Sequence, residues 1–147
     1  GALLAEGIGD TIRVSITGDP VEEVKVAQRI LSALELRRFE TNVIACPSCG
    51  RCEIDVVGIA QQVQQRLTEL SRTEPRCLAL TVAVMGCVVN GPGESEHADI
   101  GLAGGGGVGV IYRKGKPLRR VAESEMVDAL LEEVKGLLQQ SALSTKQ

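Results

Sequence analysis

The chain has 147 residues, of which 44% are hydrophobic, and its formal net charge is -3. This length and composition suit one globular domain of ordinary size with a real hydrophobic core. The charge balance excludes a dedicated nucleic-acid binder, which usually carries a clustered basic face. No apolar run approaches the roughly 20 residues that a membrane span needs, and the N-terminal residues lack the pattern of a signal peptide. Five cysteines in a chain without a secretory signal fit metal binding or free thiols better than a disulfide framework, so we expect a soluble cytoplasmic protein.

The first elements are predicted to form one strand–helix unit. Residues 11–16 alternate apolar and polar side chains, which predicts a strand with two different faces, and Arg13 and Ser15 share the polar face. The pair Asp19-Pro20 predicts a helix start, because Asp caps free N–H groups and Pro fits the first turn. Two interpretations of the polar strand face stay open. It fits an edge strand with a solvated face, and it fits a (β/α)₈ barrel strand whose polar side chains point into the mouth of the barrel.

The following segments predict a sheet covered by helices. With one Phe and one Tyr, the core must consist of aliphatic residues, which favours this architecture over an aromatic-rich sandwich. The almost continuously apolar run over residues 77–84 is typical of a central strand buried on both faces. Strands are expected at residues 41–45, 77–84, 99–103, 108–112 and 117–121. Helices are expected from Asp55 to before Pro75 and along the apolar stripe from Met126 to Leu138.

The cysteine spacing points to a metal site. Cys46 and Cys49 form a Cys-x-x-Cys pair directly after a predicted strand, and Cys87 follows the predicted central strand. A zinc ribbon needs a second such pair, which the chain lacks. A thioredoxin-type thiol pair opens a helix directly after a strand and leaves Cys87 without a role. An iron–sulfur group is favoured, because thiolates from loops are its usual ligands. Cys52 leaves the ligand count open, since it completes an all-thiolate set like that of a ferredoxin.

Two further segments carry weaker signals. Glycines 104–107 are expected to form a flexible turn rather than a phosphate loop, because no Lys-Ser/Thr pair follows them. Basic residues gather in the predicted hairpin that follows: Arg113, Lys114, Lys116, Arg119 and Arg120. This basic cluster fits docking of an acidic electron donor, and it also fits an ordinary solvated strand.

Three stretches together resemble a known family. They are Cys-Pro-Ser-Cys-Gly-Arg at residues 46–51, Met-Gly-Cys-Val-Val-Asn-Gly-Pro-Gly-Glu at 85–94 and Gly-Ile-Gly-Asp-Thr-Ile-Arg-Val-Ser at 7–15. They are similar to the 4-hydroxy-3-methylbut-2-enyl diphosphate synthases of the non-mevalonate isoprenoid pathway. The resemblance implies a [4Fe–4S] cluster, and the ligands it implies are Cys46, Cys49, Cys87 and Glu94. Cys52 departs from the family pattern.

The resemblance also implies a reaction and its partners. Such enzymes reductively open 2-C-methyl-D-erythritol 2,4-cyclodiphosphate with two electrons from a ferredoxin or flavodoxin, and an exchangeable carboxylate such as Glu94 suits a cluster that must admit a substrate oxygen. Arg13 and Ser15 are expected to bind the diphosphate. Asn90 is a candidate for orienting the substrate, and it equally fits a turn residue. The working unit is expected to be a homodimer in which each cluster domain caps the partner's barrel.

The expected fold class is α/β: a mixed β-sheet flanked by helices, similar to the cluster domain of sulfite and nitrite reductases. It is preceded by the terminal strand–helix unit of a TIM barrel. We expect the barrel remnant at residues 1–38, the cluster domain at 39–141 and a frayed tail at 142–147. A whole barrel needs about 250 residues, and the chain begins with Gly rather than Met. We therefore expect a fragment that is inactive without the barrel. Two alternatives stay open: a ferredoxin-like electron carrier that uses Cys52, and a redox-inert structural metal module.

Overall fold

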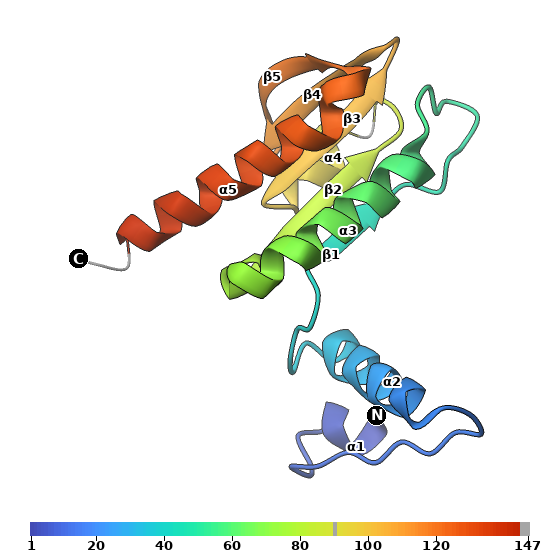
Figure 1. Ribbon diagram of the computed structural model, residues 1–147. Coiled ribbons are helices and arrows are strands. Elements are labelled where there is room, and N and C mark those ends of the chain that lie inside the picture. Colours follow the sequence, from blue (N-terminus) through green and yellow to red (C-terminus); the bar gives the residue numbers. More distant parts are fainter. Residues whose placement is uncertain (90, 145–147) are drawn as a thin grey trace. The chain divides into compact units, whose positions relative to one another are not determined.

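The computed structural model describes residues 1–89 and 91–144, with side chains up to Gln140. The chain divides into two compact units, Gly1–Phe39 and Glu40–Gln147 (Figure 1). The second unit holds the whole β-sheet and all five cysteines. Among the described residues, no helix is both long enough and apolar enough to cross a bilayer.

The first unit contains two helices, α1 (Ala2–Ala5) and α2 (Pro20–Ala33). The carboxylate of Asp19 accepts a hydrogen bond from the backbone N–H of Val21 at 2.9 Å, so the predicted cap forms. Glu22 and Glu23 follow in the first turn, where their negative charge is favourable at the positive end of the helix dipole. The helix predicted from Asp19-Pro20 is confirmed.

The strand predicted at residues 11–16 is wrong: this segment has no regular secondary structure. Strand hydrogen bonds require a neighbouring strand, and residues 1–39 contain none. The alternation of the side chains nevertheless persists over residues 12–15, although Ile16 is exposed. Ile12 and Val14 are half-buried, whereas Arg13 and Ser15 are exposed.

The second unit is built on one five-stranded sheet in the order β1-β2-β3-β4-β5. The strands are β1 (Asn42–Ala45), β2 (Thr81–Met85), β3 (Ile100–Gly105), β4 (Val108–Arg113) and β5 (Lys116–Ala122). β1, β2 and β3 are parallel to one another, and β3, β4 and β5 are antiparallel. Gly106 and Gly107 form the β3–β4 turn with φ of 60° and 77°, a conformation for which glycine is favoured. The predicted mixed α/β sheet is confirmed.

The helices of this unit are α3 (Val56–Thr73), α4 (Gly91–Glu96) and α5 (Met126–Ser144), with 3₁₀ turns η1 (Pro75–Ala79) and η2 (Glu123–Glu125). The strand predicted at residues 77–84 is wrong in its first half, because β2 begins at Thr81 and residues 77–79 lie in η1. Leu80 N–H donates to the carbonyl of Cys77 at 3.1 Å, which closes this turn. α5 continues past Ser141, through residues expected to fray.

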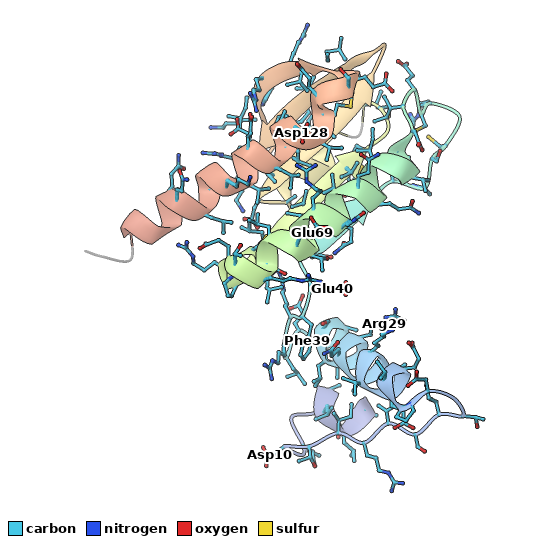
Figure 2. The ribbon with its side chains drawn as sticks, in the orientation of Figure 1. Asp10, Arg29, Phe39, Glu40, Glu69 and Asp128 are labelled. Carbon is cyan, nitrogen blue, oxygen red and sulfur yellow. The ribbon has the colours of Figure 1, made fainter. Side chains whose placement is uncertain are left out.

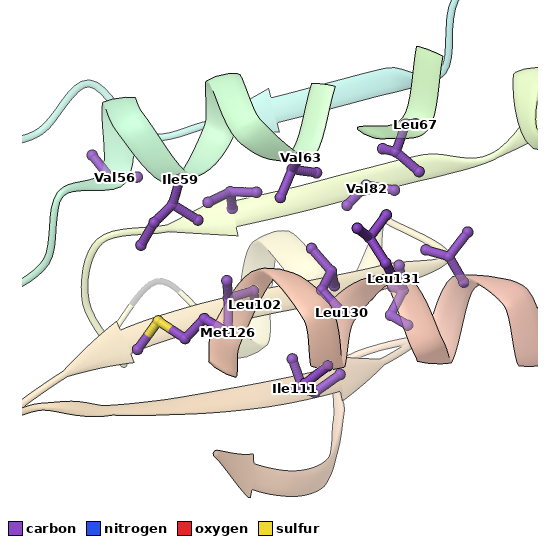
Figure 3. Packing of buried hydrophobic residues seen from close by; sticks show 14 of the residues in the cluster. Val56, Ile59, Val63, Leu67, Val82, Leu102, Ile111, Met126, Leu130 and Leu131 are labelled. Carbon is purple, nitrogen blue, oxygen red and sulfur yellow. The ribbon is translucent and has the colours of Figure 1, made fainter. Parts of the chain in front are cut away.

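The two faces of the sheet carry different side chains, as the period of two requires. Aliphatic residues on one face pack against α3 and α5 and form the main core (Figure 3): Val82, Val84, Ile100, Leu102 and Ile111. The opposite face carries two alanines beside one methionine and one tyrosine: Ala83, Ala103, Met85 and Tyr112. Gly101 also lies on this face, where an added Cβ would collide with Ser95 of α4. The short helix therefore lies very close to the sheet.

Ion pairs on the surface add little to this core. Arg66 of α3 and Asp128 of α5, which is labelled in Figure 2, are 3.0 Å apart. Their side chains are 50% and 68% exposed, so solvent screens the pair and its contribution to stability is small. Apolar packing between α3, α5 and the sheet is the main source of stability.

Truncation of the core tests this assignment. Leu67 of α3 is fully buried, so Leu67→Ala should lower the free energy of unfolding by about 2–5 kcal/mol through lost packing and a residual cavity. The matched change Leu118→Ala, at a β5 side chain that is 45% exposed, should stay within about 0.5 kcal/mol of the parent chain. Urea unfolding followed by far-ultraviolet circular dichroism measures both. Equal losses would contradict the proposed core.

One buried thiol makes stability depend on pH. Cys77 is fully buried, and the hydroxyl of Thr41 lies 3.3 Å from its sulfur. Burial raises the pKa of the Cys77 thiol above its ordinary value of 9.0, and the hydrogen bond with Thr41 offsets part of this effect. The folded state therefore holds this proton more tightly than the unfolded chain does.

The stability that Cys77 contributes should be fully present below about pH 9 and lost as pH rises through the raised folded pKa. The free energy of unfolding should consequently fall more steeply above pH 9 in the parent chain than in Cys77→Ala. Denaturation midpoints between pH 7 and pH 10.5 provide the two slopes. Parallel curves for the two proteins would show that Cys77 does not titrate differently in the folded state.

Candidate functional site

Three loops meet at one edge of the sheet. β1, β2 and β3 are parallel, so their carboxyl ends lie at the same edge, where sites in α/β folds gather. The cysteine loop, residues 46–55, follows β1; the Cys87 loop, residues 86–89, follows β2; and the glycine turn, residues 106–107, follows β3. The two cysteine motifs, far apart in sequence, are therefore neighbours in the fold.

Gly86 is the point of closest approach between the first two loops. Its backbone N–H donates to Cys46 Sγ at 3.2 Å, and Cys46 N–H donates to the carbonyl of Val84 at 3.3 Å, which extends the β1–β2 ladder by one residue. An added Cβ on Gly86 would collide with Cys52 Sγ and lie 3.4 Å from Cys46 Sγ. Glycine at this position thus leaves room for two sulfur atoms.

The cysteine loop is folded by its own hydrogen bonds. Cys52 N–H donates to the carbonyl of Cys49 at 2.9 Å, and the Cys52 thiol donates to the carbonyl of Ile54 at 3.1 Å. Cys49 itself is exposed. The backbone N–H of Arg51, and next its guanidinium, hold the pKa of the Cys49 thiol below its ordinary value. The loop ends at Asp55, whose carboxylate accepts from Gly58 N–H at 3.0 Å and caps α3.

Glu94 is an exposed residue in the first turn of α4. Gly91 brings this helix against the sheet, because an added Cβ there would collide with Ala103 and lie 3.3 Å from the Tyr112 ring. The sequence did not predict α4, since a Gly-Pro-Gly start has poor helix propensity. Asn90, the candidate for orienting substrate, lies outside the described residues.

The predicted ligands are only partly brought together. Cys87 is buried and Cys46 half-buried at neighbouring strand ends, whereas Cys49 and Glu94 are exposed. Within the part of the chain that the structure describes, no three His, Cys, Asp or Glu side chains are grouped closely enough to hold a metal ion. The place where the cysteine loop meets the Cys87 loop at Gly86 is called the junction below. Cys52, which the family pattern does not require, lies at this junction. Its Cys-x-x-Cys-x-x-Cys spacing was the only signal for this position.

Most of the basic cluster forms ion pairs with acidic residues of the same chain. Arg119 contacts Glu132 at 2.8 Å and Glu133 at 3.3 Å, and Arg113 contacts Glu133 at 3.6 Å. Lys114 pairs with Asp99 at 2.7 Å. Three of the five cations therefore attach the β4–β5 hairpin to other elements. Beside them lies an open hollow of about 550 Å³, which also reaches the Cys87 loop; it is lined by Val88, Val110, Tyr112, Pro117, Leu118, Arg119 and Arg120.

Comparison with known proteins identifies the family. Residues 42–136 match the family described as "GcpE protein C-terminal domain", which is more than half of the chain. The chain belongs to the GcpE family. Residues 1–28 match the "GcpE TIM-barrel domain", so a barrel segment precedes the C-terminal domain, as the sequence predicted.

Individual relatives agree with this GcpE assignment. The chain is 54% identical to the "4-hydroxy-3-methylbut-2-en-1-yl diphosphate synthase (flavodoxin)" of Geobacter sulfurreducens, over 94% of this chain and 37% of the relative. Proteins of the same name from Symbiobacterium thermophilum and Brevibacillus brevis are 52% and 48% identical over 99% of this chain, and over 37% and 39% of their own lengths. The chain thus spans less than two fifths of these relatives. The resemblance to this synthase family is confirmed.

The side chains at the junction fit an iron–sulfur group by their chemistry. All five cysteines are free, and thiolates from loops are the usual ligands of such groups. The Gly86 N–H directed at Cys46 Sγ is the kind of hydrogen bond that tunes the reduction potential of a cluster. This GcpE chain therefore carries free thiols of the kind that ligate an iron–sulfur group: Cys46 and Cys52 lie beside Gly86, and Cys87 follows it in sequence.

The close approach at Gly86 can be tested by adding a methyl group. Gly86 has no left-handed φ, so the effect of Gly86→Ala is steric and should cost about 1–3 kcal/mol of unfolding free energy. Removing the obstructing sulfur in Cys52→Ala should reduce this cost, so that the double variant is more stable than additivity predicts. Urea unfolding of the four proteins of this cycle measures the coupling. Additive effects would show that the two residues do not touch.

Proposed function

We propose that this chain is the iron–sulfur portion of a 4-hydroxy-3-methylbut-2-enyl diphosphate synthase, which opens a cyclic diphosphate reductively. The junction at Gly86 carries the proposal, because two cysteine motifs meet there in a chain that is about half identical to synthases of this name. The expected substrate is 2-C-methyl-D-erythritol 2,4-cyclodiphosphate.

The proposed cofactor is a [4Fe–4S] cluster held by Cys46, Cys49, Cys87 and Glu94. Such a cluster supplies two electrons, one at a time, to break the ring C–O bond and to remove a hydroxyl group as water. The two strand-end thiols have little freedom, because Cys46 directly follows β1 and Cys87 lies two residues after the end of β2. Glu94, on an exposed turn of α4, suits the role of a carboxylate that yields its place to a substrate oxygen.

The remaining residues and partners complete the proposal. Arg13 and Ser15 are exposed donors suited to a diphosphate, the first through a guanidinium fork and the second through a hydroxyl. Asn90 orients the substrate. The proposed electron donor is a flavodoxin, which the name of these relatives includes. Activity requires the rest of the barrel domain, in a cytoplasmic homodimer.

A ferredoxin-like electron carrier is the second candidate, and one observation favours it. Cys52 Sγ lies against Gly86 together with Cys46 Sγ, whereas Glu94 is exposed on a separate helix. A cluster with Cys52 as its fourth ligand would have only thiolates, which suits electron transfer without a substrate site.

Two substitutions separate these functions after anaerobic reconstitution with iron and sulfide. If Glu94 is the fourth ligand, Cys52→Ser should keep the iron content and spectrum of the parent chain. Glu94→Ala should instead lose about one iron of four and give a three-iron electron paramagnetic resonance signal on oxidation, because one iron lacks its protein ligand. Iron-to-protein ratio and low-temperature resonance spectra measure both. Cluster loss in Cys52→Ser with a normal Glu94→Ala would favour the electron carrier, and no cluster in the parent chain would refute both functions.

A further inference from the structure

Glu53 contacts both neighbouring loops at the sheet edge. It belongs to the cysteine loop, and its backbone N–H donates to the carbonyl of Gly86 in the Cys87 loop at 3.0 Å. Its carboxylate Oε2 accepts a short hydrogen bond from the backbone N–H of Gly106 in the glycine turn. One residue therefore connects the segments that follow β1, β2 and β3.

The glycine turn is shaped to receive this carboxylate. Gly106 occupies the first central position of a two-residue turn with φ of 60°, so its N–H is not used by the β3–β4 ladder. Gly105 has no side chain, and an added Cβ there would lie 3.2 Å from Glu53 Oε2 and 3.7 Å from Val88 Cγ1. The carboxylate and the residue that follows Cys87 thus share the space above Gly105.

We propose that Glu53 is a positioning residue that holds the cysteine loop against the Cys87 loop. It immediately follows Cys52, so its two hydrogen bonds fix the end of the segment that carries three of the thiols. Gly86, which accepts from Glu53, itself donates to Cys46 Sγ. The backbone N–H of Glu53 therefore attaches the cysteine loop to the Cys87 loop, and its carboxylate holds the same residue in place from the glycine turn. The predicted effect on cluster stability rests on the function proposed above. The predicted effect on thiol reactivity does not.

The thiols of the full, cluster-free chain provide the first test. Brief alkylation under reducing, anaerobic conditions is followed by tryptic mass spectrometry, in which cleavage after Arg51 separates Cys52 from Cys46 and Cys49. Glu53→Ala should speed the alkylation of Cys52 and Cys46 by about tenfold, the factor expected for one lost hydrogen bond to a charged group. Glu53→Gln keeps an acceptor for Gly106 and should stay within about twofold of the parent chain.

Two internal references make the result specific. Exposed Cys49 should react at the parent rate in every variant, and fully buried Cys77 should stay unreactive, which shows that the sheet remains folded. Glu69→Ala, at an exposed glutamate of α3 labelled in Figure 2, should leave all rates unchanged. Parent-like rates in Glu53→Ala would overturn the proposal. So would equal rates in Glu53→Ala and Glu53→Gln, because the acceptor would then not matter.

The reconstituted chain provides the second test. The visible absorption of the cluster should decay about tenfold faster under an iron chelator in Glu53→Ala than in the parent chain, Glu53→Gln or Glu69→Ala. Equal decay in all four proteins would overturn the proposed role toward the cluster. A parent chain that binds no cluster would refute the proposed function, while the alkylation rates would still decide whether Glu53 positions the loops.

Discussion

The close approach of two loops at Gly86 is the constraint on which the site depends. Parallel pairing of β1, β2 and β3 brings three strand ends to one edge, and the hydrogen bond from Cys46 to Val84 carries the pairing one residue beyond β1. Only a residue without a side chain fits between Cys46 Sγ and Cys52 Sγ at this point. Sheet topology therefore provides the proximity of the two cysteine motifs, and a single glycine provides the space for their sulfur atoms.

The asymmetry of the sheet explains how the site is supported. On one face, aliphatic side chains pack against α3 and α5 and provide most of the buried apolar surface. On the other face, glycine and alanine let α4 lie close to β3, which fixes the helix that carries Glu94. Val84 and Met85, which immediately precede the Cys87 loop, are buried on opposite faces. The loop thus starts from a strand that is held on both sides.

The sequence predicted most of the fold because its local signals were strong. Asp55 and Pro75 bounded α3, and strand-like segments on both sides of a glycine turn predicted β3 and β4. The apolar run at residues 77–84 was ambiguous, since hydrophobicity alone does not separate a buried strand from a 3₁₀ turn. Residues 11–16 carry a strand pattern, but a strand also needs a pairing partner. The role of Gly86 was not predictable, because it depends on a contact between residues 40 apart in sequence.

The unequal burial of the candidate ligands has a thermodynamic consequence. Cys46 and Cys87 are held at strand ends, so they lose little further conformational freedom when they ligate a group. Cys49 and Glu94 are exposed side chains, the first on the cysteine loop and the second on α4, so most of the side-chain ordering cost of the proposed four-ligand site falls on them. In the proposed cluster site, metal-binding free energy would offset that cost, so the proposal predicts that ordering of the cysteine loop is linked to cofactor binding. In that site, the hydrogen bonds that Glu53 makes with Gly86 and Gly106 would restrict the cysteine loop before binding and so reduce the part of the cost that the cofactor must supply.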